Sequence, residues 1–244
     1  MHGKVGMKIN KYMIKNKKGK LIVIDGTDGS GKKTQVDLLM KHLSSEGYKV
    51  KMVDFPDYSS NFFGEFIGHC LSEQYFNFVN VHPKIASVLY AADRFETKEK
   101  MEKWLNDGFI IIANRYVSAN QIHQGGKIKN AKKRQAFIEW LDEMEYKVFK
   151  IPRPNVVFYL DIPINITKRL LKERNKSTSR SYLGKKKDVH EKDFSFLENS
   201  RKSAVWLAKT QKNYVQIDCV SKNVLRTRED IHEELYKKVG KLLK

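Results

Sequence analysis

The sequence predicts an α/β fold, in which helices cover both faces of a five-stranded parallel sheet. Three observations lead to this prediction. Five short apolar runs alternate along the 244 residues with stretches of helical periodicity. Most of these runs end in a carboxylate or an amide, and ligands of open α/β sheets bind at the carboxyl ends of the strands. A glycine-rich segment lies directly between the first run and the first helical stretch.

The elements follow from these patterns in chain order. The predicted strands are short and rich in β-branched and aromatic residues, and they cover Leu21–Asp25, Tyr48–Asp54, Phe109–Ala113, Asn155–Asp161 and Tyr214–Asp218. Helical spacing of apolar residues predicts helices at 32–46, 61–72, 83–106, 131–149, 163–174, 191–213 and 224–243. Strands that alternate with helices are parallel, so the polar strand ends should meet at one edge of the sheet. These ends are Asp25, Asp54, Asn114, Asp161 and Asp218.

Length and composition indicate the domain organisation and the cellular compartment. Residues 20–244 are long enough for one domain with a full core, and neither a linker nor a repeat interrupts them. The first 20 residues hold seven lysines and no acidic residue, so we expect residues 1–19 to form a disordered basic tail. Two cysteines offer no disulfide framework, which favours a reducing cytoplasm. No apolar run reaches the roughly 20 residues that a membrane span requires, so no membrane partner is expected.

The formal net charge of +19 indicates affinity for polyanions. Besides the tail, the stretch 168–192 carries ten Lys or Arg residues and three acidic residues. Such a surplus suits either nucleic acid or a phosphorylated substrate. For most of the other lysines, a solvated helix face is the simpler interpretation.

Residues 26–35 read Gly-Thr-Asp-Gly-Ser-Gly-Lys-Lys-Thr-Gln and predict a phosphate-binding loop. Glycines let successive backbone N–H groups point at an anion, and the following helix adds the positive end of its dipole. A lysine at the Lys32 position can reach the β- and γ-phosphates of a nucleotide. The residues expected to bind the phosphates are Gly26, Gly29, Ser30, Gly31, Lys32, Lys33 and Thr34.

Lys33 departs from the pattern of this loop. The pattern ends in Ser or Thr, whose hydroxyl binds magnesium, and Lys33 stands at that position. Thr34 lies one residue later, about 100° further around the helix, so it does not simply replace the missing hydroxyl.

Further segments resemble the thymidylate kinase family of nucleoside monophosphate kinases. They are Asp-Phe-Pro-Asp-Tyr at 54–58, Leu-Tyr-Ala-Ala-Asp-Arg-Phe-Glu at 89–96, Asn-Arg-Tyr at 114–116, Gln-Gly-Gly-Lys at 124–127, Leu-Asp-Ile-Pro at 160–163 and the segment 190–198. Their order and spacing resemble the family from about residue 20 to residue 244. The resemblance implies a P-loop kinase fold with a mobile lid at about 174–190. It also implies transfer of a phosphoryl group from ATP to dTMP, dependence on Mg²⁺, and a homodimer with helix 83–106 as a candidate surface.

The resemblance assigns roles to particular residues. Asp28 would accept a hydrogen bond from the deoxyribose 3′-hydroxyl. Phe55 and Tyr90 would contact the thymine, Arg94 the base or the 5′-phosphate, and Arg115 the acceptor phosphate. The expected dTMP-binding residues are Asp28, Phe55, Pro56, Tyr90, Arg94, Arg115, His123 and Gln124. Each of these has a structural alternative, such as an ordinary core aromatic, an ion pair for either arginine, or a structural histidine at 123.

The catalytic arginine is expected from the lid. Some members of the family carry it inside the phosphate loop, at the position that Gly29 occupies here. Arg180 is favoured because it lies deeper in the lid, whereas Arg174 can instead end the preceding helix. A lid arginine would act with Lys32 and Arg115 by stabilising the charge of the transferring phosphoryl group.

The magnesium site is expected to be unusual. Asn114 stands where the family has Asp before Arg-Tyr, and Lys33 lacks a hydroxyl. We hypothesise that phosphate oxygens and water hold most of the magnesium shell, with Asp25 and Asn114 acting through water.

Three other functions are kept as alternatives. Another or broader nucleoside monophosphate kinase would prefer dUMP, CMP or several acceptors, and a nucleoside kinase would prefer thymidine. A nucleic-acid-binding P-loop protein would use the lysines of the tail and lid. That last alternative gives no reason for the spacing of Phe55, Arg94 and Arg115, so nucleic acid is expected only as a non-specific partner of the tail.

Overall fold

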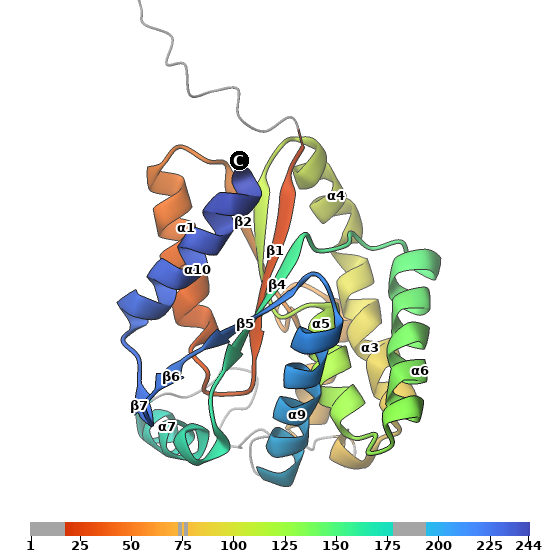
Figure 1. Cartoon of the computed structure of the whole chain (residues 1–244). Coiled ribbons are helices and arrows are strands. Elements are labelled where there is room, and N and C mark those ends of the chain that lie inside the picture. Colours follow the sequence, from red (N-terminus) through yellow and green to blue (C-terminus); the bar gives the residue numbers. More distant parts are fainter. Residues whose placement is uncertain (1–17, 73–74, 76–77, 178–193) are drawn as a thin grey trace, which may run out of the picture.

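The computed structural model describes residues 18–72, 75, 78–177 and 194–244 (Figure 1). Its main sheet has five strands in the order β2-β3-β1-β4-β5, and every neighbouring pair in it is parallel. This confirms the predicted fold class. The strands are β1 (Lys20–Gly26), β2 (Val50–Asp54), β3 (Ile110–Asn114), β4 (Val156–Asp161) and β5 (Tyr214–Asp218).

Helical segments alternate with these strands. They are α1 (Lys32–Ser45), α2 (Phe62–Leu71), η1 (Phe78–Asn80), α3 (Pro83–Glu96), α4 (Lys98–Asn106), α5 (Val117–Ala119), η2 (Asn120–Gln124), α6 (Ala131–Asp142), η3 (Glu143–Val148), α7 (Ile164–Ser177), α9 (Phe194–Thr210) and α10 (Arg228–Leu243). The short helical segment formed by α5 and η2 was not predicted from the sequence.

Helices cover both faces of the sheet (Figure 1). On one face, Leu39 of α1 and Leu235 of α10 pack against Ile22 of β1. On the other face, α4, α6 and α9 pack against a second cluster that includes Val23 of β1. Nearly every residue of β1 is buried, as expected for a central parallel strand that is covered on both sides. The strands point their carboxyl ends toward the edge at which α7 lies (Figure 1).

The helix expected over 83–106 is interrupted at Thr97, so that prediction was wrong in extent. The side-chain amide of Asn61 donates to the carbonyl oxygen of Asp93 at 2.8 Å and to the hydroxyl of Thr97 at 2.9 Å. The Thr97 N–H bonds instead to the carbonyl of Arg94. Because Asn61, the residue that precedes α2, bonds to the carbonyl that would continue the helix, α3 ends and α4 begins anew.

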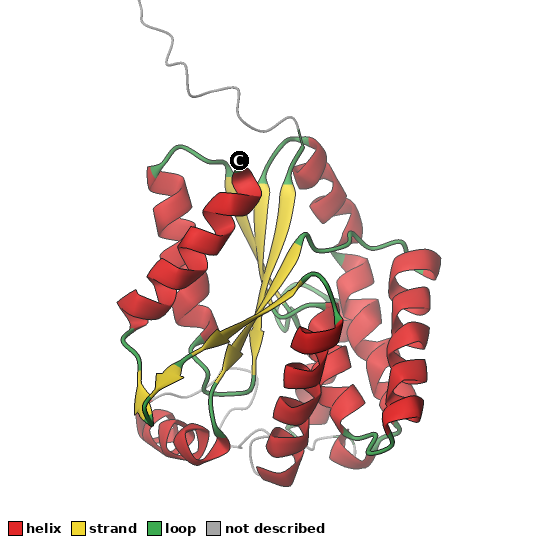
Figure 2. Cartoon of the chain, in the orientation of Figure 1, coloured by secondary structure: helices red, strands yellow, loops and turns green. Residues whose placement is uncertain are grey.

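Two other helix predictions need correction. The expected helix 131–149 is regular only to Asp142, after which η3 forms a π-helical turn. The helix expected from residue 224 begins at Arg228, where the Thr227 hydroxyl caps it by accepting from the Asp230 N–H at 3.0 Å. Before it, β6 (Val220–Ser221) and β7 (Val224–Leu225) form an antiparallel hairpin (Figure 2). The two residues of its turn, Lys222 and Asn223, both have positive φ, as a two-residue hairpin turn requires.

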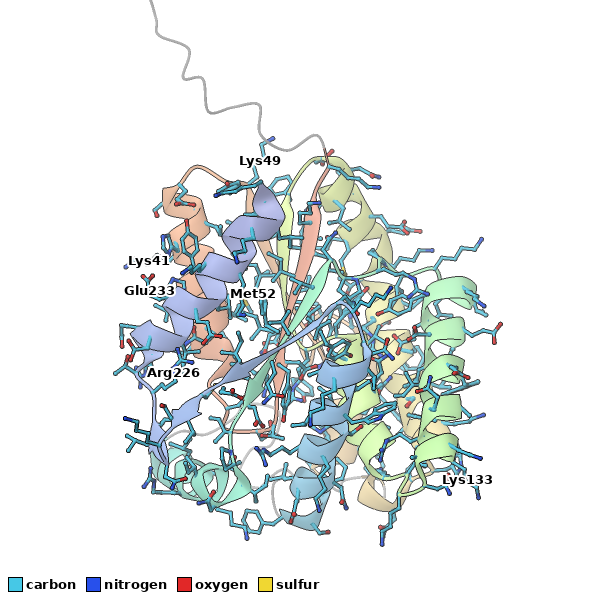
Figure 3. The ribbon with its side chains drawn as sticks, viewed as in Figure 1. Lys41, Lys49, Met52, Lys133, Arg226 and Glu233 are labelled. Carbon is cyan, nitrogen blue, oxygen red and sulfur yellow. The ribbon has the colours of Figure 1, made fainter. Side chains whose placement is uncertain are left out.

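The predicted lid is only partly within the described residues. α7 extends to Ser177, so residues 174–177 are helical and 178–190 lie outside the described residues. The tail predicted at 1–19 also lies outside them, apart from its last two residues. Lys41 of α1 and Lys133 of α6 are exposed and project outward (Figure 3), in keeping with solvated helix faces. No helix among the described residues combines the length and the apolar character needed to cross a bilayer.

Candidate active site

A cavity of about 660 Å³ lies at the carboxyl ends of the strands. It brings together most of the residues that the sequence predicted. The predicted residues that line it are Asp28, Gly29, Gly31, Lys32, Lys33, Thr34, Phe55, Pro56, Tyr90, Arg94, Asn114, Arg115, His123 and Gln124. Gly26, Ser30 and Asp25 were also predicted but do not line the cavity. Arg180 lies outside the described residues, and only the helical backbone of Arg174 is described.

The phosphate loop has the conformation that its glycines predict. Gly29 and Gly31 have φ of 80° and 83°, a region that other residues rarely adopt. The Lys32 ammonium group donates to the carbonyl oxygens of Gly26 at 2.9 Å and Thr27 at 3.0 Å. The side chain of Lys32 is therefore held along the loop at the start of α1, where an anion is favoured.

Lys33 points along the exposed side of α1. Its ammonium group forms an ion pair with Asp37, one helical turn later, and both side chains are more than half exposed. Lys33 still lines the cavity. The position therefore offers a positive charge to the phosphates instead of an oxygen ligand to a metal.

Arg115 forms the centre of a polar cluster. Its Nη2 donates to Asp28 Oδ1 at 2.5 Å and its Nη1 to His123 Nε2 at 2.8 Å. Because that nitrogen of His123 accepts, its Nδ1 carries the proton and lies 3.1 Å from the Ser200 hydroxyl. Burial disfavours the charge of Arg115, but the carboxylates of Asp28 and Asp25 outweigh this and raise its pKa. The φ of Arg115 is 66°, a strained value for a non-glycine residue in a cavity wall.

A further part of the cavity lining, the aromatic wall, consists of Phe55, Tyr90 and Gln124. Phe55 is 2 % exposed, and its ring lies tilted against that of Tyr116. Tyr90 is half-buried and makes an edge contact with Phe78. Gln124 is 1 % exposed, and its Oε1 has no hydrogen-bond partner among the described residues. This wall offers ring surfaces and one oriented polar atom to a ligand.

Arg94 has a partner that the sequence did not predict. Its Nε and Nη2 donate to the two carboxylate oxygens of Glu145, each at 2.6 Å. Both side chains are buried. Burial disfavours the charge of Arg94, but the carboxylate of Glu145 outweighs this effect and raises the pKa of Arg94. The pair is therefore a buried one, in contrast to the surface ion pair that was the alternative interpretation. The remaining nitrogen, Nη1, lies 3.3 Å from the carbonyl oxygen of Tyr116.

Asp93 joins the loop after β2 to α3. Its carboxylate accepts from the Asp57 N–H at 3.3 Å and from the Asn61 amide at 2.9 Å. Burial raises its pKa to about 6. Asp57 follows Pro56 in the loop after β2, and Asp93 lies between two cavity residues of α3, Tyr90 and Arg94. The carboxylate thus holds that loop against α3.

Two strand ends bring Asp54 and Asn114 side by side. The two residues are register partners in β2 and β3, and Asn114 Nδ2 donates to Asp54 Oδ1 at 2.9 Å. Asn114 Oδ1 has no partner among the described residues. By contrast, Asp25 is fully buried, and its two oxygens accept from the Gly26 N–H and the Ser118 hydroxyl. Asp25 therefore supports the loop and does not face the cavity.

Several residues of the cavity were not among the assigned site residues. They are Tyr58, Leu71, Ala119, Asn120, Leu170, Phe196 and Arg228. Asp54 was expected at this edge of the sheet as a polar strand end, although no role was assigned to it. Phe196 and Arg228 come from α9 and α10, and no local pattern relates these helices to the cavity.

The match to a family model decides the classification. The thymidylate kinase model matches residues 24–231, which includes the phosphate loop, the aromatic wall and the Arg115 cluster. The chain belongs to the thymidylate kinase family. It is therefore related to nucleoside monophosphate kinases, as the motifs predicted.

Individual relatives of the thymidylate kinase family agree. The chain is 30 % identical over 198 residues to the thymidylate kinase of Thermosipho melanesiensis, covering 81 % of this chain and 88 % of the relative. It is 26 % identical over 227 residues to that of Plasmodium falciparum, covering 93 % and 92 %. The solved structure of the Candida albicans thymidylate kinase matches with a TM-score of 0.69 at 21 % identity, covering 93 % of this chain and 94 % of that one.

Proposed function

We propose that the protein transfers the γ-phosphoryl group of ATP to dTMP, giving dTDP and ADP. The observation that carries this proposal is one cavity that joins the phosphate loop, the Arg115 cluster and the aromatic wall. The loop suits the phosphates of the donor, the guanidinium group suits the phosphate of the acceptor, and the rings suit a pyrimidine.

The chain's own residues act by positioning and charge neutralisation. An oxygen of the dTMP phosphate attacks the γ-phosphorus of ATP. A phosphate oxygen is already ionised near pH 7, so no side chain has to remove a proton. Lys32 would hold the β- and γ-phosphates, and Arg115 would hold the acceptor in line. A lid arginine, Arg180 or Arg174, stays a prediction for the charge of the transferring group.

Asp28 and Gln124 are proposed to orient the nucleoside. Asp28 Oδ1 is bound by Arg115, so the acceptor for the 3′-hydroxyl and the phosphate-binding arginine are fixed relative to each other. Gln124 Oε1 is buried without a partner among the described residues and can accept from a donor on the base. His123 is held by both ring nitrogens, which supports a rigid ring next to the sugar.

Magnesium is the proposed metal of the reaction. When bound with ATP, it would neutralise charge that develops on the phosphates, and Asn114 would help to hold it through water. The buried, unpartnered Oδ1 of Asn114 supports a hydrated ion at this edge of the sheet, because magnesium prefers oxygen ligands and keeps several waters.

A coupled ADP-release assay with dTMP, dUMP, dCMP, dGMP, UMP and thymidine tests the proposed reaction. We expect the highest kcat/KM with dTMP. A higher value with another monophosphate would replace dTMP as the substrate, and a higher value with thymidine would make the protein a nucleoside kinase. The panel is broad because the Candida albicans enzyme is described as having broad substrate specificity.

Binding to nucleic acid is the competing function from another class. It predicts strong binding of DNA or RNA that weakens steeply with salt. Deletion of residues 1–19 should abolish any such binding and leave the kinase activity intact. Tight nucleic-acid binding by the shortened protein, without kinase activity, would favour the competing function.

We propose that a homodimer forms through α3. Ile85, Val88 and Phe95 are 60 %, 42 % and 48 % exposed, and their spacing places them on one side of this helix. Exposed apolar groups that cluster in this way mark interaction surfaces. Light scattering after size exclusion should show a dimer for the wild type and a monomer for Ile85→Glu. Val224→Glu is the matched control, because Val224 is 67 % exposed and lies in β7.

A further inference from the structure

We propose that Asp54 is the protein carboxylate that holds the magnesium ion of this site, through bound water and together with Asn114. The inference rests on the proposed function and specifies the metal site of the same cavity. It replaces Asp25, the carboxylate that the sequence favoured.

The first step is the need for a carboxylate. Magnesium at phosphoryl-transfer sites is held by the substrate phosphates, by water and by one or two carboxylates. In P-loop proteins a Ser or Thr of the loop and a separate Asp usually share this task. Here Lys33 replaces the hydroxyl, and its ammonium group is paired with Asp37. The metal therefore depends more strongly on a carboxylate elsewhere in the cavity.

The second step is the choice among carboxylates. Among the described residues that line the cavity, only Asp28 and Asp54 carry one. Asp28 is committed to Arg115. Asp25 is fully buried, and both of its oxygens are bonded beneath the loop. Asp54 is thus the cavity carboxylate without an ion-pair partner within the described part of the chain.

The third step is the orientation of Asp54 and Asn114. The side-chain amide of Asn114 donates to Asp54 Oδ1 at 2.9 Å, so the Oδ1 atom of Asn114 faces away from Asp54. That oxygen is buried and has no partner among the described residues. Asp54 Oδ2 and Asn114 Oδ1 are both acceptors, and water molecules on a cation present only donors to them. The pair therefore suits the outer side of a hydrated magnesium ion.

The fourth step is the distance to the phosphate loop. Asp54 ends β2, which is separated from β1 by β3. Neighbouring strands lie about 4.8 Å apart, so Asp54 is roughly 10 Å across the sheet from the strand that carries the loop. A bound water lengthens the reach of the Asp54 carboxylate toward an ion at the phosphates, so a water-mediated contact suits this position better than direct ligation. No group of three or more metal-ligating side chains occurs among the described residues, in agreement with a site completed by water and phosphate.

Manganese binding tests the proposal without relying on turnover. The free Mn²⁺ signal in electron paramagnetic resonance gives the affinity of Mn²⁺ for the full-length protein with ADP and dTMP bound. Asp54→Asn should weaken this affinity by about 10–100-fold, the usual effect of losing a residue that supports a metal site. The exchange variant Asp54→Asn/Asn114→Asp, which moves the carboxylate to the neighbouring strand, should recover most of the loss.

Asp218→Asn is the matched control, because Asp218 also ends a strand, on the far edge of the sheet, and is exposed. It should leave Mn²⁺ affinity unchanged. Unchanged affinity in Asp54→Asn, an equal loss in the control, or no recovery in the exchange variant would overturn the proposal. If the wild type binds Mn²⁺ in this way but does not phosphorylate dTMP, the proposed reaction fails and the metal assignment stands.

Discussion

Removal of Glu145 should destabilise the protein more than removal of any exposed acidic residue near it. Arg94 is 2 % exposed and Glu145 is 0 % exposed, and two hydrogen bonds of 2.6 Å join them. Glu145→Ala would leave a buried guanidinium without its counter-charge, which costs about 3–5 kcal/mol. The Asn120 amide, 3.1 Å from Glu145 Oε1, would lose an acceptor as well. For a chain of this size, about 2–4 °C per kcal/mol converts this to a loss of roughly 6–20 °C in Tm.

Urea denaturation followed by circular dichroism measures this loss. Glu143→Ala is the control, because Glu143 lies in the same π-helical turn and forms a 3.8 Å pair with Lys147 in which both side chains are well exposed. An exposed pair contributes about 0–1 kcal/mol. The reasoning is refuted if Glu145→Ala lowers the free energy of unfolding no more than Glu143→Ala does.

A double variant separates stability from substrate binding. Arg94→Met/Glu145→Leu replaces the pair by apolar groups, which is often neutral or stabilising. Most of the stability lost in Glu145→Ala should therefore return. The KM for dTMP should stay raised, because Arg94 lines the cavity. A wild-type KM in the double variant would show that Arg94 supports the fold and does not contact the acceptor.

Two further predictions concern packing and pH. Gly64→Ala should destabilise the protein by about 1–3 kcal/mol, because its new Cβ would lie 1.9 Å from the carbonyl oxygen of Asp57. Gly240→Ala, where nothing lies within 4 Å, should instead stabilise α10 by up to about 1 kcal/mol, and equal thermal melts of the two variants would contradict the packing argument. His232 lies 2.9 Å from His42, and burial together with His42 lowers its pKa. The unfolded chain then binds more protons, so the free energy of unfolding should fall as the pH drops below the ordinary histidine pKa of about 6.5. His232→Gln should flatten this dependence between about pH 7 and 5, and an unchanged slope would argue against it.

Local patterns predicted the sheet and the phosphate loop well. The strand ends agree with the predicted runs within two residues, because a buried parallel strand is a short apolar run whatever its neighbours are. The loop was predictable because φ values such as those of Gly29 and Gly31 demand glycine. Asn114 and the phosphate loop meet at the cavity because the carboxyl ends of parallel strands lie at one edge of the sheet, whereas Tyr90 and Arg94 of α3 were expected there from the family resemblance.

Contacts between distant segments decided what the patterns missed. The break at Thr97 depends on Asn61, which is 36 residues away. The buried ion pair of Arg94 depends on Glu145, which is 51 residues away. A helix pattern contains no information on which distant side chain will reach its carbonyls or its charges, so the sequence indicated one long helix and, as the alternative to a ligand contact, a surface ion pair for Arg94.

The sequence by itself determined the succession of strands and helices along the chain and the phosphate loop, whereas the residues expected around the acceptor followed from the resemblance to the thymidylate kinase family. The elements and the loop depend on backbone geometry and on the period of apolar residues, which act over a few neighbours. Only the tertiary structure decided that Asp25 is buried beneath the loop, that Asp54 faces the cavity beside Asn114, and that Asp28 is joined to Arg115. These outcomes depend on which strand lies next to which, and strand order is set by packing of the whole sheet.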